Sequence, residues 1–378
     1  MVGVLGRPGA RRRRIPLSVL SAGTRLMPAV LPSMPAAVKR ALLGFHTVTV
    51  DGNTLDPSLQ LLLAGLRVGG IPGIVVSGPA GDDDVTLSRT VMRDTCIGLG
   101  GPVGPVEVAE LSIPGPAGAL GVRHYRTDGA SSALVFFHGG GYALGDLDGY
   151  DTLCRRLCHD AQTQVFSVDY RLAPEHPAPA AVDDCCAAYS WVVDNAADFD
   201  LPADRIAVGG DSAGGGLAAA VSQWARQQPV CDPVLQLLLY PVTDLDARTR
   251  SRTLFADGYL LTGHDIAVFR DLYVGDSGVP VTDPRVSPLL AEELGGLPPA
   301  LVVTAGFDPL RDEGNYYAAA LQRAGVPVDL RQLGSMIHGF MNFAGLGGQV
   351  DRSVADITSA LRAHLRRGGT GGVITPVR

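Results

Sequence analysis

Short apolar runs alternate with longer amphipathic segments through most of the chain. The runs lie at residues 133–137, 165–168, 206–208, 234–240, 300–304 and 328–333. Helical patterns lie at residues 150–161, 180–195, 213–226, 311–324 and 354–365. Apolar strands that alternate with helices are typical of βαβ units, in which helices cover both faces of a parallel sheet. The pattern therefore predicts an α/β fold with a mostly parallel central sheet.

Two strands and two helices are predicted ahead of this alternating part. Strand patterns at residues 106–113 and 120–126 flank a turn rich in Pro and Gly, which indicates an antiparallel hairpin at one sheet edge. Asp56 and Pro57 supply an N-cap and a first-turn proline for a helix that continues to Leu66. Acidic residues at 82–84 precede a second helical pattern that ends near Ile97.

The connection between the runs at 234–240 and 300–304 is too long for a simple crossover. It contains a predicted helix from His264 to Val274 and a Pro-rich return. Long insertions in compact domains usually form lids or binding elements. We therefore predict a basic arm at residues 1–40, N-terminal cap helices at 41–105, and a main domain at 106–378 that carries a cap insertion at 244–290.

Charge is distributed unevenly along the 378 residues. The whole chain carries 31 Lys and Arg against 38 Asp and Glu, a net charge of −7. Residues 1–40 contain seven Arg, one Lys and no acid, so they carry +8 and the remainder carries −15. An acidic body argues against nucleic acid as a partner. The basic arm, with its apolar residues, is compatible with a peripheral contact to anionic lipid.

The cysteines and the N-terminus bear on the compartment. The six cysteines show no disulfide framework and no metal-ligand spacing supported by histidine, so we expect free thiols and no metal. Four arginines at 11–14 precede a mildly apolar stretch that resembles a signal peptide, but prolines interrupt it and no small-x-small cleavage site follows. We expect a cytoplasmic protein. Its oligomeric state is left open, and a dimer is compatible with the sequence.

A serine flanked by glycines follows one of the apolar runs. Residues 209–215 read Gly-Gly-Asp-Ser-Ala-Gly-Gly and come directly before a helical pattern. A strand, a sharp turn and a helix around a serine are typical of a nucleophile elbow, in which residues two before and two after the serine must be small. Gly210 and Gly214 fill these places around Ser212. Taken alone, the motif also fits a packing turn or a phosphate loop.

A second glycine run is predicted to stabilise negative charge. His138 and three glycines directly follow the run at 133–137. Backbone N–H groups aimed into a pocket suit a tetrahedral oxyanion. We predict donors at Gly139 and Gly140, with a third at Ala213. His138 precedes the serine and is interpreted as a structural residue.

An acid and a base follow later strands. Asp308 comes just beyond the run at 300–304, and His338 lies in the loop after the last run. Asp312 is an alternative acid, but its position suits a helix cap. The order Ser212, Asp308, His338 is that of α/β-hydrolases. These three residues are the predicted catalytic triad.

Together, these motifs resemble those of the hormone-sensitive-lipase-like family of α/β-hydrolases, and the layout is similar to that of its actinobacterial members. The matching segments are residues 138–141, 170–175, 210–215, 308–312 and 338–340. The resemblance implies the α/β-hydrolase fold, a helical cap, no cofactor, and a carboxylic-ester hydrolase (esterase or lipase) that acts through a covalent acyl-enzyme. It also implies a scaffolding role for residues 170–175 and small-molecule esters with short to medium acyl chains.

Two other functions are considered for this fold. An amidase or deacetylase would need the same triad, and a ligand receptor on this fold would lack one of its members, although all three positions are filled here. Apolar residues of the predicted cap could line an acyl pocket or merely pack the cap on the body. They are Leu59, Leu62, Leu63, Leu66, Phe255, Tyr259, Leu260 and Phe269.

Overall fold

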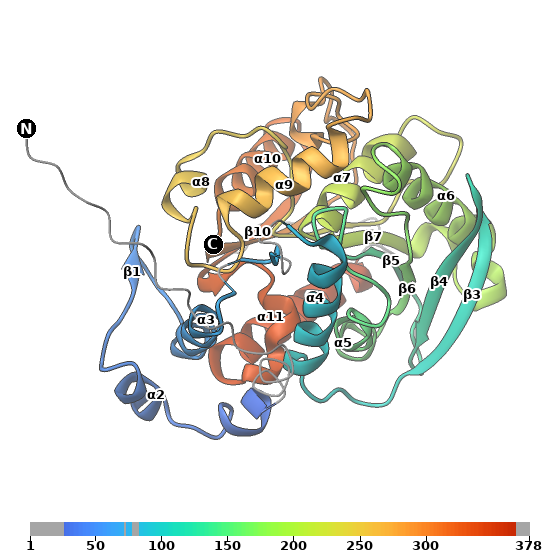
Figure 1. Cartoon of the computed structure of the whole chain (residues 1–378). Coiled ribbons are helices and arrows are strands. Elements are labelled where there is room, and N and C mark those ends of the chain that lie inside the picture. The colour runs from blue at the N-terminus through green and yellow to red at the C-terminus, as the bar shows by residue number, and fades with distance from the viewer. Residues whose placement is uncertain (1–25, 72, 78–82, 368–378) are drawn as a thin grey trace, which may run out of the picture.

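One mixed sheet forms the centre of the molecule. The computed structural model describes residues 26–71, 73–77 and 83–367, and its large sheet has the strand order β10-β9-β8-β7-β5-β6-β4-β3 (Figure 1). The strands are β3 (Glu107–Gly115), β4 (Gly118–Arg126), β5 (Ala133–Phe137), β6 (Gln164–Val168), β7 (Ile206–Asp211), β8 (Gln236–Leu239), β9 (Ala300–Phe307) and β10 (Val328–Ile337). β4 pairs antiparallel with β3 and with β6, whereas the other neighbours pair in parallel. The predicted α/β fold with an antiparallel edge hairpin is confirmed.

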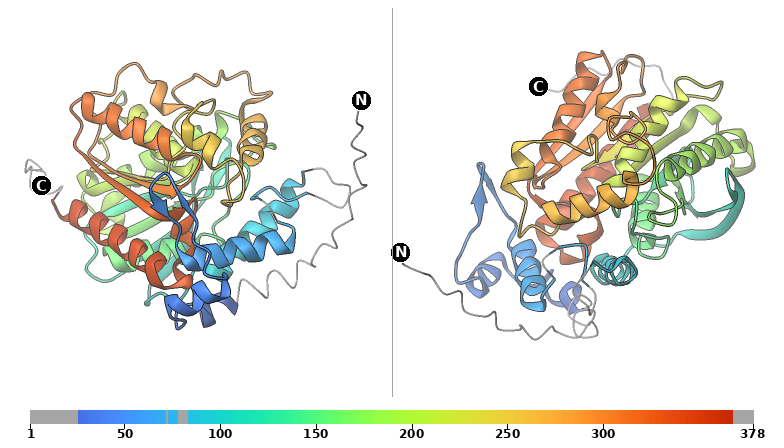
Figure 2. Two further views of the ribbon diagram at one scale, coloured as in Figure 1. Left: turned by 90° about the vertical axis from the view of Figure 1, so that its left-hand side faces the viewer. Right: turned by 45° about the horizontal axis from the view of Figure 1, so that its top comes forward.

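Helices cover both faces of this sheet (Figures 1 and 2). α5 (Asp151–Ala161) and α11 (Gly348–Arg367) pack on one face. α6 (Ala180–Asp194), α7 (Ala213–Ala225) and α10 (Arg311–Arg323) pack on the other. Since neither face meets water, the central strands can be apolar at every position.

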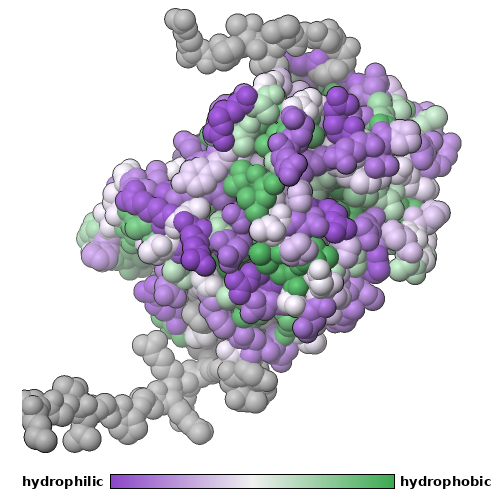
Figure 3. Space-filling model, turned by 90° about the horizontal axis from the view of Figure 1, so that it is seen from above, coloured by the Kyte–Doolittle hydropathy of each residue, from purple (hydrophilic) through white to green (hydrophobic). Residues whose placement is uncertain are grey.

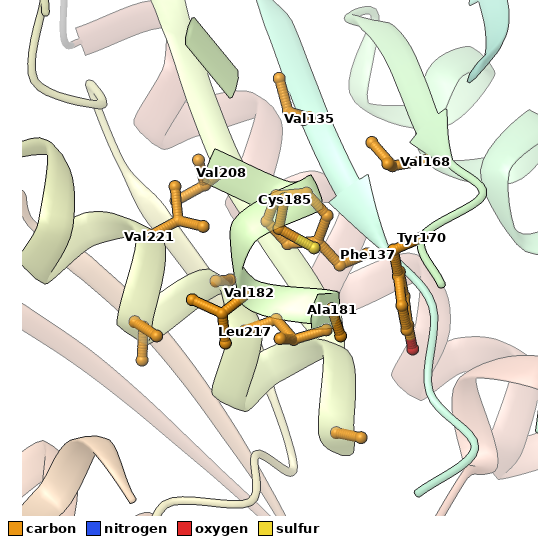
Figure 4. Close-up of a cluster of buried hydrophobic side chains, with 14 of the residues drawn as sticks. Val135, Phe137, Val168, Tyr170, Ala181, Val182, Cys185, Val208, Leu217 and Val221 are labelled. Carbon is orange, nitrogen blue, oxygen red and sulfur yellow. The ribbon is translucent and has the colours of Figure 1, made fainter. Parts of the chain in front are cut away.

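Successive strand residues supply the two cores. In β5, Val135 and Phe137 contact the side chains of α6 and α7 (Figure 4). Leu134 and Phe136 lie in the opposite core, beside α5 and α11. This alternation follows from the pleat of the strand, which points neighbouring side chains to opposite faces. The apolar run at 133–137 therefore contributes side chains to two separate cores.

The N-terminal segment contains more regular structure than the sequence indicated. Its elements are α2 (Ala36–Leu42), β1 (Thr49–Val50), β2 (Asn53–Thr54), α3 (Pro57–Gly69) and α4 (Val85–Leu99). The end of the predicted basic arm at residues 1–40 is helical, because it overlaps α2. There the buried Lys39 Nζ donates to Ser58 Oγ at 2.9 Å and connects α2 to α3. Residues 1–25 of the arm lie outside the described residues.

The predicted N-cap at Asp56 is present, and one of the acids at 82–84 caps the second helix. The Asp56 carboxylate accepts from the backbone N–H groups of Ser58 and Leu59 at the start of α3. The Asp84 carboxylate accepts from Leu87 N–H at the start of α4. These bonds satisfy donors that the first turn of a helix leaves free.

The long insertion forms two helices and joins the N-terminal segment. They are α8 (Arg250–Leu254) and α9 (Gly263–Val274), and α9 begins with a capping box between Thr262 and Asp265. The buried carboxylate of Asp265 also accepts from the N–H groups of Ile74 and Val75, at 3.1 and 2.8 Å. One side chain therefore connects two segments that are far apart in sequence.

The last strand and the last helix are longer than predicted. β10 continues to Ile337 through a break in its pairing register between Leu333 and Ile337. That irregularity begins where the predicted apolar run at 328–333 ends. α11 begins at Gly348, well before the predicted start at residue 354. As a result, His338 lies directly at the end of a strand.

The surface seen from above is mostly hydrophilic, with apolar residues exposed near its middle (Figure 3). In the described part of the chain, no helix combines the length and the apolar character that crossing a membrane requires.

Candidate active site

Ser212 occupies a sharp turn between β7 and α7. Its backbone has φ 57° and ψ −120°, a conformation that is costly for a residue with a side chain and is found mainly at functional sites. The turn is held by hydrogen bonds from Ser212 N–H to Leu239 O, at 2.8 Å, and from Val242 N–H to Ser212 O, at 3.0 Å. The sequence-predicted strand, turn and helix around the serine are all present.

The small residues beside the turn are required by close backbone contacts. A Cβ atom on Gly214 would clash with the carbonyl oxygen of Phe137, at the end of β5. A Cβ atom on Gly210 would clash with the carbonyl oxygens of Gly214 and Phe137. The glycines thus allow α7 to start close to β5, which brings Ser212 beside the glycine run that follows β5.

The structure brings Ser212, His338 and Asp308 into one hydrogen-bonded chain. His338 Nε2 lies 2.8 Å from Ser212 Oγ, and His338 Nδ1 lies 2.8 Å from Asp308 Oδ2. All three residues are buried, and each follows the carboxyl end of a parallel strand. Because these strand ends meet at one edge of the sheet, residues 126 positions apart become neighbours.

The acid fixes the tautomer of the imidazole. A carboxylate only accepts hydrogen bonds, so His338 Nδ1 carries the proton and Nε2 is free to accept the Ser212 hydroxyl proton. The second carboxylate oxygen, Asp308 Oδ1, accepts from Leu310 N–H at 2.8 Å, which holds the orientation of the group. Asp312, the alternative acid, instead accepts from Ser251 N–H and from Arg311.

The glycine run after β5 requires a correction to the predicted oxyanion donors. Gly139 N–H donates to Asp211 Oδ1 at 2.7 Å, so the only N–H of this residue is already used. Gly140 and Gly141 line the cavity in front of Ser212. The Ala213 N–H begins α7, and the first N–H groups of a helix have no partner within it. The bond to Asp211 therefore removes Gly139 from the predicted donors and leaves the N–H groups of Gly140, Gly141 and Ala213 as candidates.

Asp211 joins the glycine run to the serine turn. Besides Gly139, it accepts from the hydroxyl groups of Tyr150, at 3.1 Å, and Tyr240, at 3.4 Å. Burial raises the pKa of Asp211 to about 6, although the hydrogen bond from Gly139 N–H opposes this shift. No signal in the sequence identified the two tyrosines, which come from distant segments.

His138 also contacts the glycine run, on the side opposite to Asp211. Its buried Nδ1 contacts the carbonyl oxygen of Gly139 at 2.8 Å, and the Tyr170 hydroxyl donates to His138 O at 2.6 Å. Burial lowers the pKa of His138, which keeps the ring neutral. These contacts agree with a structural residue.

A cavity of about 110 Å³ lies in front of Ser212 and His338. Its walls are mainly apolar, and α4, α9 and the segment after α3 contribute to them. Its lining includes Leu66, Ile71, Val91, Met92, Cys96, Leu245, Leu260, Leu261, Phe269 and Phe343. A mainly apolar cavity with one activated hydroxyl suits an apolar group attached to a reactive carbonyl.

The predicted cap residues divide between cavity and core. Leu66, Leu260 and Phe269 line the cavity, as the acyl-pocket interpretation expected. Leu59 and Phe255 are instead fully buried in the core, where Phe255 packs edge-on against Tyr259. Leu62 is also buried there, and Leu63 lines a neighbouring cavity. The contribution of α4 was not predicted, because its apolar residues are too few to distinguish a pocket wall from a surface helix.

The cysteines are free thiols, and Cys231 is exposed whereas the other five are buried. Within residues 26–71, 73–77 and 83–367, no cluster of three or more His, Cys, Asp or Glu side chains could hold a metal ion.

Comparison with known proteins shows which family the chain belongs to. A family model described as alpha/beta hydrolase fold matches residues 134–342. Carboxylic ester hydrolase LipN of Mycobacterium tuberculosis is 53% identical over 362 residues, which are 94% of this chain and 94% of that protein. Ethyl acetate hydrolase of Pseudomonas putida is 36% identical over 82% of this chain and its own full length.

A solved structure has the same architecture. Ester-hydrolase EH1AB1 from the metagenome of Lake Arreo superimposes with a TM-score of 0.77 at 38% sequence identity, covering 82% of this chain and 99% of that chain.

Proposed function

Because this chain belongs to the hormone-sensitive-lipase-like family of α/β-hydrolases and is a serine ester hydrolase, we propose that Ser212, His338 and Asp308 are its catalytic triad. The observation that carries the proposal is the continuous hydrogen-bonded chain from Ser212 Oγ through His338 to Asp308, with 2.8 Å at both contacts. Ser212 faces the apolar cavity, where the ester would bind.

Acylation starts at the serine. Ser212 Oγ attacks the ester carbonyl carbon while His338 Nε2 takes the hydroxyl proton, and the carbonyl π electrons move onto the oxygen. Asp308 stabilises the imidazolium that results. The tetrahedral intermediate then collapses: its C–O bond to the alcohol breaks, and His338 gives its proton to the leaving oxygen.

Deacylation repeats the sequence with water. His338 Nε2 takes a proton from water, whose oxygen attacks the acyl-enzyme carbonyl. The second tetrahedral intermediate releases the acid and returns the proton to Ser212 Oγ. No cofactor is needed, because each step transfers only protons and the acyl group.

The backbone donors of the oxyanion hole are proposed to be Gly140, Gly141 and Ala213. The commitment of Gly139 N–H to Asp211 supports this assignment. It gives Gly139 a positioning role: its bond to Asp211 sets the glycine run beside the serine turn, so that the next two N–H groups face the cavity.

The cap is proposed to consist of the N-terminal helices in residues 41–105 together with the insertion at 244–290. Support comes from the cavity, whose walls include Met92 of α4 and Phe269 of α9, and from the bonds by which Asp265 joins these two segments.

The cavity volume predicts a preference for short acyl chains. An apolar cavity of about 150 Å³ holds a molecule the size of benzene, so the 110 Å³ in front of Ser212 suits an acyl group of a few carbons. In a p-nitrophenyl ester series, we expect kcat/KM to be highest between acetate and hexanoate and to fall about tenfold or more at palmitate. Failure to hydrolyse any of these esters would contradict the proposed function, and a maximum at palmitate would contradict the short-chain assignment.

Leu260 provides a variant that tests the cavity wall. It lines both the cavity at Ser212 and a neighbouring cavity, which also involves Leu63 and Gly258. Leu260→Ala is therefore expected to connect the two and to raise the ratio of decanoate to butyrate turnover. Leu63→Ala, which changes only the outer cavity, is the matched control and should leave that ratio within about twofold.

We also propose that the protein is cytoplasmic and that its N-terminal segment contacts anionic membranes. Residues 1–40 carry a charge of +8, as counted above. α2, at the end of this segment, exposes the apolar side chains of Val38 and Leu42 and buries Lys39. Phe45, just beyond α2, is 75% exposed. Exposed apolar side chains next to clustered arginines suit a surface with acyl chains and anionic headgroups.

Vesicle binding tests this contact. Replacing the four arginines at 11–14 by serine should weaken binding to phosphatidylserine vesicles strongly, since each arginine near such a surface contributes about 1 kcal/mol. The double change Leu42→Asp with Phe45→Asp should also weaken binding. Tyr316→Asp, on the exposed side of α10, is the control. Equal sedimentation of all variants, or binding to neutral vesicles alone, would reject the membrane contact.

A further inference from the structure

One arginine of α4 reaches the loop that follows the glycine run. Arg89 Nε donates to the carbonyl oxygen of Ala143 at 2.8 Å, and Arg89 Nη2 donates to that of Ala173 at 2.9 Å. Nη1 and Nη2 also donate to the two carboxylate oxygens of Glu175, at 2.8 and 2.7 Å. Four of the five N–H groups of the guanidinium are therefore used.

The two carbonyl groups belong to segments that meet at the turn after Gly140 and Gly141. The N–H groups of Ala143 and Leu144 donate to Gly140 O, at 3.2 and 2.8 Å, and close that turn. Ala173 N–H donates to Tyr142 O at 2.8 Å, which joins the turn to residues 170–175. By binding a carbonyl on each side, Arg89 spans the junction.

This turn needs support, because its backbone is strained. Gly140, Gly141 and Tyr142 follow one another with φ of 116°, 62° and 62°. The left-handed conformation is unfavourable for a tyrosine and persists only where neighbouring groups hold it. The Tyr142 ring stacks on Tyr273 at 3.9 Å, which holds the side chain, whereas Arg89 holds the backbone on both sides.

We propose that Arg89 is a positioning residue for the oxyanion hole, which fixes the backbone turn so that the N–H groups of Gly140 and Gly141 face the substrate oxygen. This inference rests on the proposed function. Arg89 acts through the loop, because its guanidinium is engaged by Ala143, Ala173 and Glu175 and it is not among the cavity-lining residues.

Glu175 orients the guanidinium. The hydrogen bonds from Arg89 lower the pKa of Glu175 to about 2, so the carboxylate stays charged throughout the pH range of an ester assay. The Glu175 side chain is 55% exposed and that of Arg89 is 26% exposed. Ion pairs between exposed groups contribute little to stability. We therefore expect the loss of Arg89 to change the geometry of the loop more than the stability of the fold.

The same helix also borders the cavity in front of Ser212. Met92 and Cys96 of α4 line the cavity, while Arg89 holds the oxyanion loop. On the next turn, Arg93 Nε donates to Asp146 Oδ2 at 2.7 Å. α4 therefore contributes both to the wall of the cavity and to the contacts that hold the loop after Gly141.

The test compares two arginines on one helix. Arg89→Met removes the bonds to the two loop carbonyls, whereas Arg93→Met removes a bond to a carboxylate only. For Arg89→Met, we expect kcat to fall about 10- to 100-fold with KM within about threefold, since misplacing a donor costs transition-state stabilisation and not ground-state binding. For Arg93→Met, we expect a loss of less than about threefold. Arg89→Lys keeps the charge but not the fork of donors, and its kcat should lie between those of the wild type and Arg89→Met.

The measurements must separate a displaced loop from a misfolded fraction. Each kcat is expressed per active site titrated with a p-nitrophenyl phosphonate. The inhibition constant of a trifluoromethyl ketone, whose oxyanion occupies the hole, should rise for Arg89→Met in proportion to the fall in kcat/KM.

Two outcomes would overturn the positioning role: equal losses per active site in Arg89→Met and Arg93→Met, or unchanged ketone affinity. If Arg89→Met fails to fold, the same two measurements on Arg89→Lys decide the question. Activity that survives in Ser212→Ala would instead reject the proposed function, whatever Arg89 does.

Discussion

Ser212→Ala is expected to lower kcat for p-nitrophenyl butyrate by about four to six orders of magnitude. The change removes the Oγ that lies 2.8 Å from His338 Nε2, so no acyl-enzyme can form. The residual rate would come from the oxyanion donors, which can still stabilise attack by water. Alanine keeps the Cβ and hence the backbone strain at φ 57°, so the melting temperature should change little.

A chemical label locates the nucleophile independently of the rate. Diethyl p-nitrophenyl phosphate should add one phosphoryl group to the wild type, on the peptide that contains Ser212, and none to Ser212→Ala. Ser222→Ala is the matched control: Ser222 lies on α7, where its hydroxyl bonds to Ala218 O, away from the cavity. That variant should keep its turnover and its label. A label on another residue, or turnover in Ser212→Ala near the wild-type value, would refute the assignment of the nucleophile.

Asp308→Asn is expected to lower kcat by about four orders of magnitude with little change in KM. The surrounding contacts explain why an isosteric change costs so much. Leu310 N–H donates to Oδ1, so the asparagine carbonyl oxygen would keep that place and the amide NH₂ would face His338 Nδ1. An NH₂ group only donates, which forces the imidazole proton onto Nε2. His338 could then no longer accept the proton of Ser212.

Asp312→Asn is the control for this second prediction. Asp312 was the alternative acid in the sequence, but its carboxylate contacts Ser251 N–H and Arg311 and not the imidazole. We expect kcat to stay within about threefold of the wild type, because the change removes one charge interaction of a partly buried side chain that does not contact His338. Steady-state rates for both variants check the assignment. Equal losses, or the larger loss in Asp312→Asn, would show that the acid is misassigned.

Both segments of the proposed cap contact the glycine run after β5. Asp265 of α9 binds the backbone of Ile74 and Val75, and Phe269 of the same helix packs against Gly141, where a Cβ atom would clash with its ring. Arg89 of α4 holds the other side of the same loop. Contacts from both segments therefore converge on the glycine run, so the proposed cap would both line the cavity and support the proposed oxyanion donors.

The sequence by itself determined the fold class and the order of Ser212, Asp308 and His338. It could do so because both are local signals. Each apolar run and each helical pattern is read within a short window, and each of the three residues lies in the loop shortly after a predicted strand. In a parallel sheet, strand ends at the same edge must meet, so order along the chain implied proximity in space.

Only the tertiary structure decided which backbone groups are free and which side chains face the cavity. Gly139, Gly140 and Gly141 are the same residue type and adjacent in the chain, so the sequence does not separate them. Gly139 differs because its N–H donates to Asp211, 72 residues away. Likewise, Leu59 and Leu66 belong to the same helical pattern, yet Leu59 packs in the core and Leu66 lines the cavity. Such differences depend on contacts between distant segments, which local periodicity does not encode.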